Sequence, residues 1–372
     1  MTNHGKIVHI FKSSSDGVEL ISLSKSIIRK NFATGYSTNI LLDTNIIIDI
    51  ERAYETRGRH KFLKDAGVIQ LANLVKATKR SSIFLSPGAA YQEIPPGRIH
   101  CVERAFNQFV ADYLPFFQDD PNSLPANASS AYDGIPNFSD LTLQQKQVIS
   151  IPYASLLAAN CIDRLPELSS FEKFSLYFKY CADVLDVVSL KELAIARYAF
   201  APEVGITTEV RDRRNSVRNN FFKLKKAARK NLSESETLIR ISMNGAMDLK
   251  IIIAADIVND KEEQFPLGLT KMDVWIATSD SKLYEFCQSC PGFILPGGNG
   301  PMARLFETHF DISKTDYWRE TLDFQKTQLE KRLPRSLDKK PSLDKIIKAA
   351  FELEARISEG SSSRFLLELL EK

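Results

Sequence analysis

The sequence predicts an α/β fold: a doubly wound parallel sheet flanked by helices, with a large, mostly helical insertion and a helical C-terminal extension. An apolar, β-branched run at 39–42 ends at Asp43, which suits a buried parallel strand. A second strand pattern at 82–85 precedes a turn and helix start at 86–88. A third returns at 273–280. Strands that alternate with helices favour parallel pairing through right-handed crossovers.

The segments between these strands read as helices. Apolar residues recur at helical spacing over 62–79, and 89–94 continues from the turn after the second strand. Residues 342–357 form an amphipathic pattern with a period near 3.6, so we expect this helix to pack onto this chain or onto a second copy.

The character of the chain changes at residue 95, where prolines and polar stretches interrupt the pattern before a helical, aromatic-rich region. We therefore expect one discontinuous domain of 1–94 plus 245–310, an insertion at 95–244 and a C-terminal extension at 311–372.

The composition is that of an ordinary globular protein. The 372 residues are 44% hydrophobic and 26% charged, and the net charge of +3 is too small to indicate a nucleic-acid partner by itself. Five cysteines do not form a disulfide framework, and the N-terminus lacks a signal-peptide pattern. The apolar stretch 148–162 is too short to cross a bilayer. These features predict a soluble cytoplasmic protein with no membrane contact.

Four carboxylates stand where a parallel sheet exposes its ligand-binding edge. Asp43 ends the first strand, and Glu93 lies about one turn into the helix after the second. Asp248 is expected to open a helix, and Asp280 follows the last strand. Carboxylates that converge repel one another, and a hard cation such as Mg²⁺ or Mn²⁺ is the usual way to hold them together.

One or two such ions would support phosphodiester cleavage by stabilising the attacking and leaving oxygens and by activating a water molecule. No histidine is needed for this chemistry, which agrees with the absence of all five histidines from these motifs: His4, His9, His60, His100 and His309.

Four motifs carry these acids: ILLDTN with Asp43, IFLSPGAAYQEI with Glu93, MDLKIIIAA with Asp248, and WIATSD with Asp280. Their order resembles the PIN-domain nuclease family. The resemblance implies a PIN-like sheet whose carboxylate pocket binds Mg²⁺ or Mn²⁺ and hydrolyses nucleic acid.

The resemblance also implies a role for each site residue. Asp43, Glu93 and Asp248 would bind the principal ion, and Asp280 a second, weaker one. The supporting residues would be Asn45, which orients the first acid, and Thr278, which supplies a hydroxyl. The chain departs from small members of the family in the long separation between Glu93 and Asp248.

Each acid also has a simpler interpretation. Asp43 and Asp248 could be helix N-cap residues, and Glu93 and Asp280 solvated acids. Asp273 could replace Asp280, and two further acids, Asp49 and Asp256, are expected to face solvent or cap neighbours. A haloacid-dehalogenase-type phosphatase needs a second acid two positions after the first, where this chain has Asn45.

A basic segment, 211–230, contains nine Lys or Arg residues and one acid, with Phe221 and Phe222 in its middle. It could follow phosphates and stack a base, or it could be a solvated helix whose phenylalanines dock on the core. The candidate nucleic-acid-binding residues are Arg211, Arg213, Arg214, Arg218, Lys223, Lys225, Lys226 and Arg229.

The sequence thus predicts a metal-dependent phosphodiesterase, an endoribonuclease first, with RNA as its partner. A degenerate module that only binds RNA or protein, and a structure-specific DNA nuclease, are the alternatives. A second copy of the chain and a protein inhibitor remain open as further partners.

Overall fold

The computed structural model of the protein describes residues 5–12, 14–15, 20–78, 82–116, 137–224, 231–261, 271–289, 292–295, 302–305, 315–336 and 342–370. They divide into two compact units. Unit 1 comprises Met1–Pro136 and Ile251–Phe306, and unit 2 comprises Asn137–Lys250 and Glu307–Lys372. This division differs from the boundaries expected from sequence, because residues 95–136 belong with the sheet and residues 311–372 belong with the helical region.

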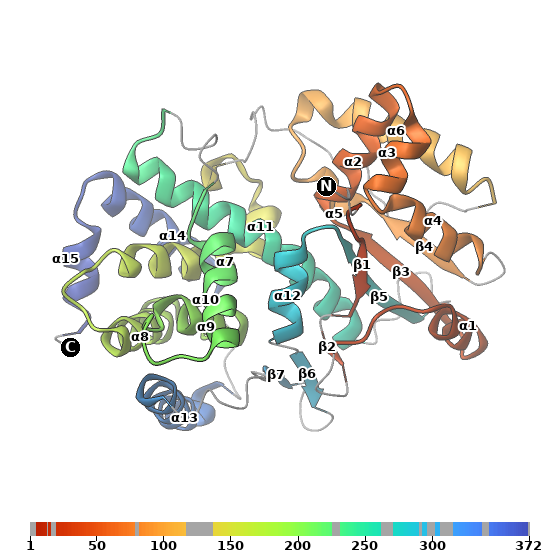
Figure 1. The fold of residues 1–372 in the computed structure, drawn as a ribbon. Coiled ribbons are helices and arrows are strands. Elements are labelled where there is room, and N and C mark those ends of the chain that lie inside the picture. The colour runs from red at the N-terminus through yellow and green to blue at the C-terminus, as the bar shows by residue number, and fades with distance from the viewer. Residues whose placement is uncertain are drawn as a thin grey trace. The chain divides into compact units, whose positions relative to one another are not determined.

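Unit 1 is built on a four-stranded sheet in the order β1-β5-β3-β4 (Figure 1). Its strands are β1 (His9–Phe11), β3 (Tyr36–Leu42), β4 (Ile83–Ser86) and β5 (Lys271–Thr278). The strand β3 pairs in parallel with both β4 and β5, which confirms the predicted parallel core. The edge strand β1 runs antiparallel to β5 and was not predicted.

Helices follow the strands β3, β4 and β5 of unit 1 along the chain, as the α/β pattern predicts. The helices of this unit are α1 (Lys25–Ala33), α2 (Thr44–Glu55), α3 (Arg59–Asp65), α4 (Val68–Lys76), α5 (Gly88–Tyr91), α6 (Pro96–Tyr113) and α12 (Ser281–Ser289). A second, small sheet has the order β2-β6-β7, from Ser14–Ser15, Gly292–Leu295 and Met302–Leu305.

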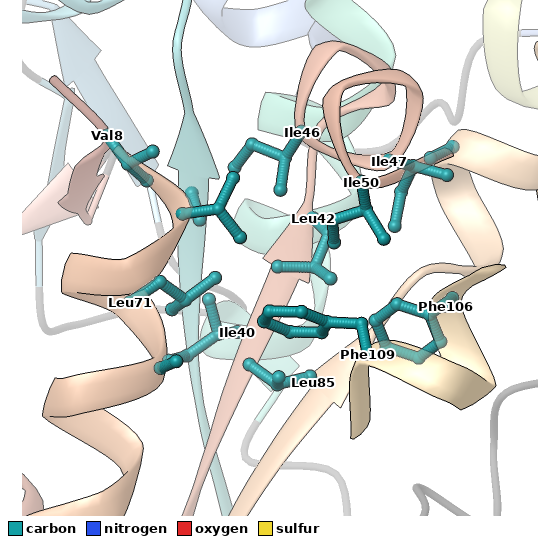
Figure 2. Close-up of a cluster of buried hydrophobic side chains, with 14 of the residues drawn as sticks. Val8, Ile40, Leu42, Ile46, Ile47, Ile50, Leu71, Leu85, Phe106 and Phe109 are labelled. Carbon is teal, nitrogen blue, oxygen red and sulfur yellow. The ribbon is translucent and has the colours of Figure 1, made fainter. Parts of the chain in front are cut away.

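The core of unit 1 lies between the sheet and the helices α2, α4 and α6. Figure 2 shows Ile40 and Leu42 of β3 facing Ile46 and Ile50 of α2, with Phe109 of α6 beside them. All five side chains are fully buried, and each such burial contributes about 2 kcal/mol. Because α6 shares this core, it belongs with the sheet and not with the insertion.

Unit 2 is helical within its described part. Its elements are η1 (Phe138–Asp140), α7 (Leu143–Asp163), α8 (Ser170–Lys179), η2 (Tyr180–Leu185), α9 (Leu190–Phe200), α10 (Thr208–Phe221), α13 (Asp316–Ser336), α14 (Leu343–Ser358) and α15 (Ser362–Leu367), together with α11 (Glu234–Lys261) as far as Lys250. The predicted C-terminal amphipathic helix is α14, which packs on α7 of the same chain. Phe351 of α14 lies 5.0 Å from Phe138, centroid to centroid. No helix in the described ranges is long and apolar enough to cross a membrane.

The helix predicted over 62–79 is instead two helices, α3 and α4. Gly67 separates them with φ +77°, a conformation that glycine adopts without steric cost. The backbone of Lys6 and Val8 approaches this glycine so closely that an added Cβ would lie 2.6 Å from the Lys6 carbonyl oxygen. The corner therefore needs glycine both for its backbone angle and for the close approach of the N-terminal segment.

Replacing Gly67 with alanine is expected to lower the free energy of unfolding by more than 2 kcal/mol, because the new Cβ adds a steric clash to the cost of a positive φ. Gly35→Ala is the matched control. Its φ is +80° but nothing lies within 4 Å of the added Cβ, so only the backbone cost of about 1–2 kcal/mol should appear. Urea unfolding of both variants measures the difference, and equal losses would contradict the close-approach argument.

Candidate carboxylate site

The sheet register brings the carboxyl ends of β3, β4 and β5 to one edge. Leu42 is paired with Ala277 of β5, and Leu41 with both Ile276 and Ser86. The ladder continues one residue beyond β3, since the backbone N–H of Asp43 donates to the Ala277 carbonyl over 3.0 Å. Residues that follow these three strands are therefore neighbours in space, as the sequence analysis expected.

Asp43 is buried at this edge, with 9% of its surface exposed. Thr278 donates its hydroxyl to Oδ2 of Asp43 over 2.6 Å, and Asn45 donates its side-chain amide to the same oxygen over 3.0 Å. Asp43 does occupy the N-cap position of α2, but its side chain accepts no capping hydrogen bond. The two polar residues predicted to support Asp43 thus contact it, and the simple capping interpretation does not account for its side chain.

The pKa of Asp43 is raised from 3.8 to about 6, and burial is the largest cause. The negative charge of Glu93 contributes to the same shift, and that of Asp280 contributes more weakly. The hydrogen bonds from Thr278 and Asn45 oppose the shift because they stabilise the ionised carboxylate. The structure therefore brings three of the four predicted acids within electrostatic range of one another; we call Asp43, Glu93 and Asp280 the carboxylate edge.

Asp43 differs from the other buried acids of unit 1 in lacking a cation. Asp49 is bound by Lys6 at 2.8 Å, Glu51 by Arg98, and Asp273 by Lys12. No Lys or Arg among the described residues forms an ion pair with Asp43. A buried carboxylate is costly unless it is paired, so the ionised form of Asp43 lowers the stability of the fold.

Asp49 corrects one expectation. It was predicted to face solvent or to cap a neighbour, but only 3% of its surface is exposed, and both of its carboxylate oxygens accept from Lys6. Its helix, α2, also buries the adjacent charged position Glu51.

Glu93 lies in the turn after α5, because that helix ends at Tyr91 and is shorter than the predicted 89–94. The Thr44 hydroxyl donates to Oε2 of Glu93 over 2.6 Å. Thr44 is thus a site residue that the sequence analysis missed. The available signal was its place between Asp43 and Asn45, at the first position of α2.

Asp280 serves two roles at once. Its Oδ1 accepts the backbone N–H groups of Lys282 and Leu283 over 2.8 and 3.3 Å, so it caps the start of α12. Its own N–H donates over 2.9 Å to the Thr278 hydroxyl that contacts Asp43. The charge of Asp280 reaches Asp43 as well. Thr278 therefore connects two acids of the edge.

Asp273 does not replace Asp280. It lies near the start of β5, where Asn31 and Trp275 donate to its Oδ2 over 2.5 and 2.7 Å and Lys12 pairs with it. These donors satisfy the carboxylate at the end of the strand remote from Asp43.

Asp248 lies in the middle of α11, so the expectation that it opens a helix is wrong. It belongs to unit 2, and the Asn244 amide donates to it over 3.5 Å within the same helix. Its membership of the carboxylate site stays a prediction.

The edge offers the hard oxygen donors that Mg²⁺ and Mn²⁺ prefer. Among the described residues, no three His, Cys, Asp or Glu side chains are close enough to form a complete metal-holding group.

His9 is a neighbour of the edge that no motif indicated. It pairs with Thr278 across the sheet, and its ring stacks on Tyr284 of α12 with centroids 3.9 Å apart. Burial lowers its pKa, so the ring is neutral at pH 7. This stacking gives His9 a packing role beside the carboxylates.

The basic segment of α10 is used largely for internal contacts. Arg218 pairs with Asp163 at 2.7 Å, and Arg214 donates to the Ala201 carbonyl over 2.7 Å. Phe221 and Phe222 are buried, which confirms the alternative that they dock on the core and excludes base stacking on them. The remaining described candidates are Arg211, Arg213 and Lys223, whereas Lys225, Lys226 and Arg229 lie outside the described residues.

No family model matches the chain, and no curated protein or solved structure is significantly similar to it. The functional argument therefore depends on the residues and their geometry.

Asp43→Asn is expected to raise stability at neutral pH. A carboxylate whose pKa is higher in the folded state favours folding below pH 4, and this contribution is lost as pH rises to about 6. The loss amounts to about 3 kcal/mol, so the variant should gain up to that amount at pH 8 and its pH dependence should flatten. Asp49→Asn is the opposite control, because it removes the partner of Lys6 and should cost about 1 kcal/mol. Urea unfolding between pH 3 and 8 tests both; destabilisation of Asp43→Asn at pH 8 would reject the unpaired charge.

Thr278→Val should raise the pKa of Asp43 above its value of about 6. The change removes a hydroxyl that stabilises the ionised carboxylate, and the expected shift is about one unit. Carboxyl ¹³C NMR titration measures it directly. Thr278→Ser keeps the donor and should restore the wild-type titration, and a shift of the same size in both variants would point to altered packing instead.

Proposed function

We propose that this protein is a metal-dependent phosphodiesterase that acts on nucleic acid, most directly as an endoribonuclease. The observation that carries the proposal is that Asp43 is buried beside Glu93 and Asp280 without a cationic side chain among the described residues. The other acids of unit 1 that are buried among the described residues, Asp49, Glu51 and Asp273, each have such a cation. A divalent ion would supply the missing charge.

The residues that would hold the ion are Asp43, Glu93 and Asp280, all in unit 1. When bound, a divalent cation offsets the charge of a phosphodiester and makes a water molecule a better nucleophile. The chain's own hydrogen bonds orient the ligands: Thr278 and Asn45 hold Oδ2 of Asp43, and Thr44 holds Glu93. No side-chain nucleophile is required.

A non-catalytic binding module is the second candidate, because the described residues contain no complete three-ligand metal group. Metal binding separates the two candidates without a substrate. Under the catalytic proposal, Mn²⁺ should raise the melting temperature of the wild-type protein by linkage and leave that of Asp43→Asn unchanged. A structure-specific DNA nuclease would show the same metal response and differ only in its preferred substrate.

Asp43→Asn should lower Mn²⁺-dependent cleavage of a labelled single-stranded RNA 12-mer by about 10³-fold, because the central ligand loses its charge. Glu93→Gln and Asp280→Asn should each lower it by about 10- to 100-fold. Glu55→Gln is the matched control, since Glu55 is exposed at the far end of α2. Gel-based initial rates measure all four variants with and without EDTA. Cleavage that persists in EDTA, or in Asp43→Asn, would refute the proposal.

A further inference from the structure

The turn before α3 and α3 itself expose a run of positive side chains in unit 1. Arg57, Lys61 and Lys64 are exposed, and none of them forms an ion pair or hydrogen bond through its side chain with a described residue. Arg59 differs, because it pairs with Asp112 at 2.7 Å and lies over the Tyr54 ring at 3.9 Å. The cluster around Arg59 anchors the segment, and the other three cations remain available to a ligand.

Aromatic rings accompany these cations. The His60 ring is nearly parallel to that of Tyr113 on α6, with centroids 6.1 Å apart, and its Nδ1 lies 3.3 Å from the Tyr113 hydroxyl. Lys76 of α4 lies 5.7 Å from the centroid of the same tyrosine ring. His60 and Lys64 are four residues apart on α3 and so share one face. Cations and rings thus alternate over three helices.

We propose that this surface binds single-stranded nucleic acid; we call it the α3 patch and define it as Arg57, His60, Lys61, Lys64, Lys76 and Tyr113. Positive side chains contact the phosphates, and the exposed His60 ring stacks on a base regardless of sequence. Tyr113 is half-buried and stacks on Phe109, so it supports His60 from below and does not itself contact a base. An acidic peptide would match the charges but would make no use of the exposed His60 ring. This inference rests on the proposed function in one respect: it assigns the α3 patch as the surface that holds the substrate strand.

The patch and the carboxylate edge lie at opposite ends of α2. Asp43 immediately precedes this helix, and Arg57 follows its last residue by two positions. The 12-residue helix is about 18 Å long at 1.5 Å per residue. A stacked strand rises about 3.4 Å per nucleotide, so about five nucleotide steps cover that length. A strand that reaches both regions therefore needs at least about six nucleotides.

This position solves an electrostatic problem of the proposed function. Asp43 carries a buried negative charge without a cationic partner among the described residues, and this charge repels a phosphate chain. A cationic surface about one helix length away can hold the strand by several phosphates without neutralising the acids themselves. The α10 segment offers less to a ligand, because Arg214 and Arg218 are engaged in internal contacts.

Binding is tested in Asp43→Asn protein, which removes cleavage from the measurement. Fluorescence anisotropy with a labelled U12 RNA, in EDTA, gives the affinity from 50 to 300 mM salt. Lys61→Gln, Lys64→Gln and Lys76→Gln combined should weaken binding by about 10- to 100-fold at 100 mM salt and lower the salt slope by about 2, which is the value for three lost phosphate contacts. The control combines Lys25→Gln, Arg29→Gln and Lys30→Gln on α1, three exposed cations of the same unit; it should bind like the parent.

His60→Ala adds a test of the rings and should weaken binding further without changing the salt slope, because stacking releases no counterions. Equal losses of RNA affinity in the triple variant of the α3 patch and in the triple variant of α1 would overturn the proposal of a specific surface. The absence of RNA binding by the parent protein would overturn it as well. Displacement of U12 by a glutamate 12-mer at equal charge concentration would assign the surface to acidic proteins and also overturn the proposal.

Substrate length separates the patch from the proposed activity. In the catalytically intact protein, the α3 substitutions should lower kcat/KM for U12 and leave that for a trinucleotide unchanged, since a trinucleotide is too short to span both regions. If U12 and the trinucleotide lose equally, the patch fails while the nuclease proposal stands. If neither is cleaved by the wild-type protein but the binding results hold, the nuclease proposal fails and the patch stands.

Discussion

The candidate site of unit 1 depends on the buried carboxylate of Asp43, which has no cationic side chain beside it among the described residues. The parallel register of β3 and β5 fixes Asp43 beside Thr278, and the turn after β4 adds the charge of Glu93. Ionising Asp43 at neutral pH then costs about 3 kcal/mol. That is comparable to one or two of the buried side chains in Figure 2, so the core can offset it. Unit 1 thus tolerates at this edge a charge that it neutralises at its other described buried acids, Asp49, Glu51 and Asp273.

The contrast with Asp49 explains why the charge at Asp43 is informative. Both acids are buried, Asp43 at the N-cap of α2 and Asp49 in the middle of that helix. Lys6 reaches Asp49 from the N-terminal segment, which is held by the Lys6 N–H bond to the Asp65 carbonyl. Asp43 receives neutral donors instead. Neutral donors orient a carboxylate without neutralising its charge. A carboxylate that binds a cation needs that charge, whereas the same charge lowers the stability of the fold when no cation is bound.

Sequence reasoning identified the parts of the site that follow from local pattern. An apolar strand that ends in an acid locates Asp43 and Asp280, and parallel pairing then brings them together. Sequence reasoning failed where contacts between distant segments determine the local structure. Gly67 splits one predicted helix because the N-terminal segment approaches it, and Asp248 lies within a long helix because the residues before it are also helical. Local charge was equally misleading, since Arg218 of the most basic segment is paired internally.

The same limitation explains why the α3 patch was not visible in the sequence. Its residues lie among apolar positions with helical spacing, so the pattern predicts a packed helix and says nothing of how its polar side chains are used. Only the structure shows that Lys61 and Lys64 remain exposed while Tyr113 comes from another helix to meet His60. A nuclease needs two opposite electrostatic surfaces, one that holds a cation and one that holds the polyanion. If the two surfaces were adjacent, their cations and acids would form ion pairs, and neither charge would remain available to a ligand. A separation of about one helix length is roughly two Debye lengths at physiological salt and is too long for direct pairing, so both charges persist in one small unit.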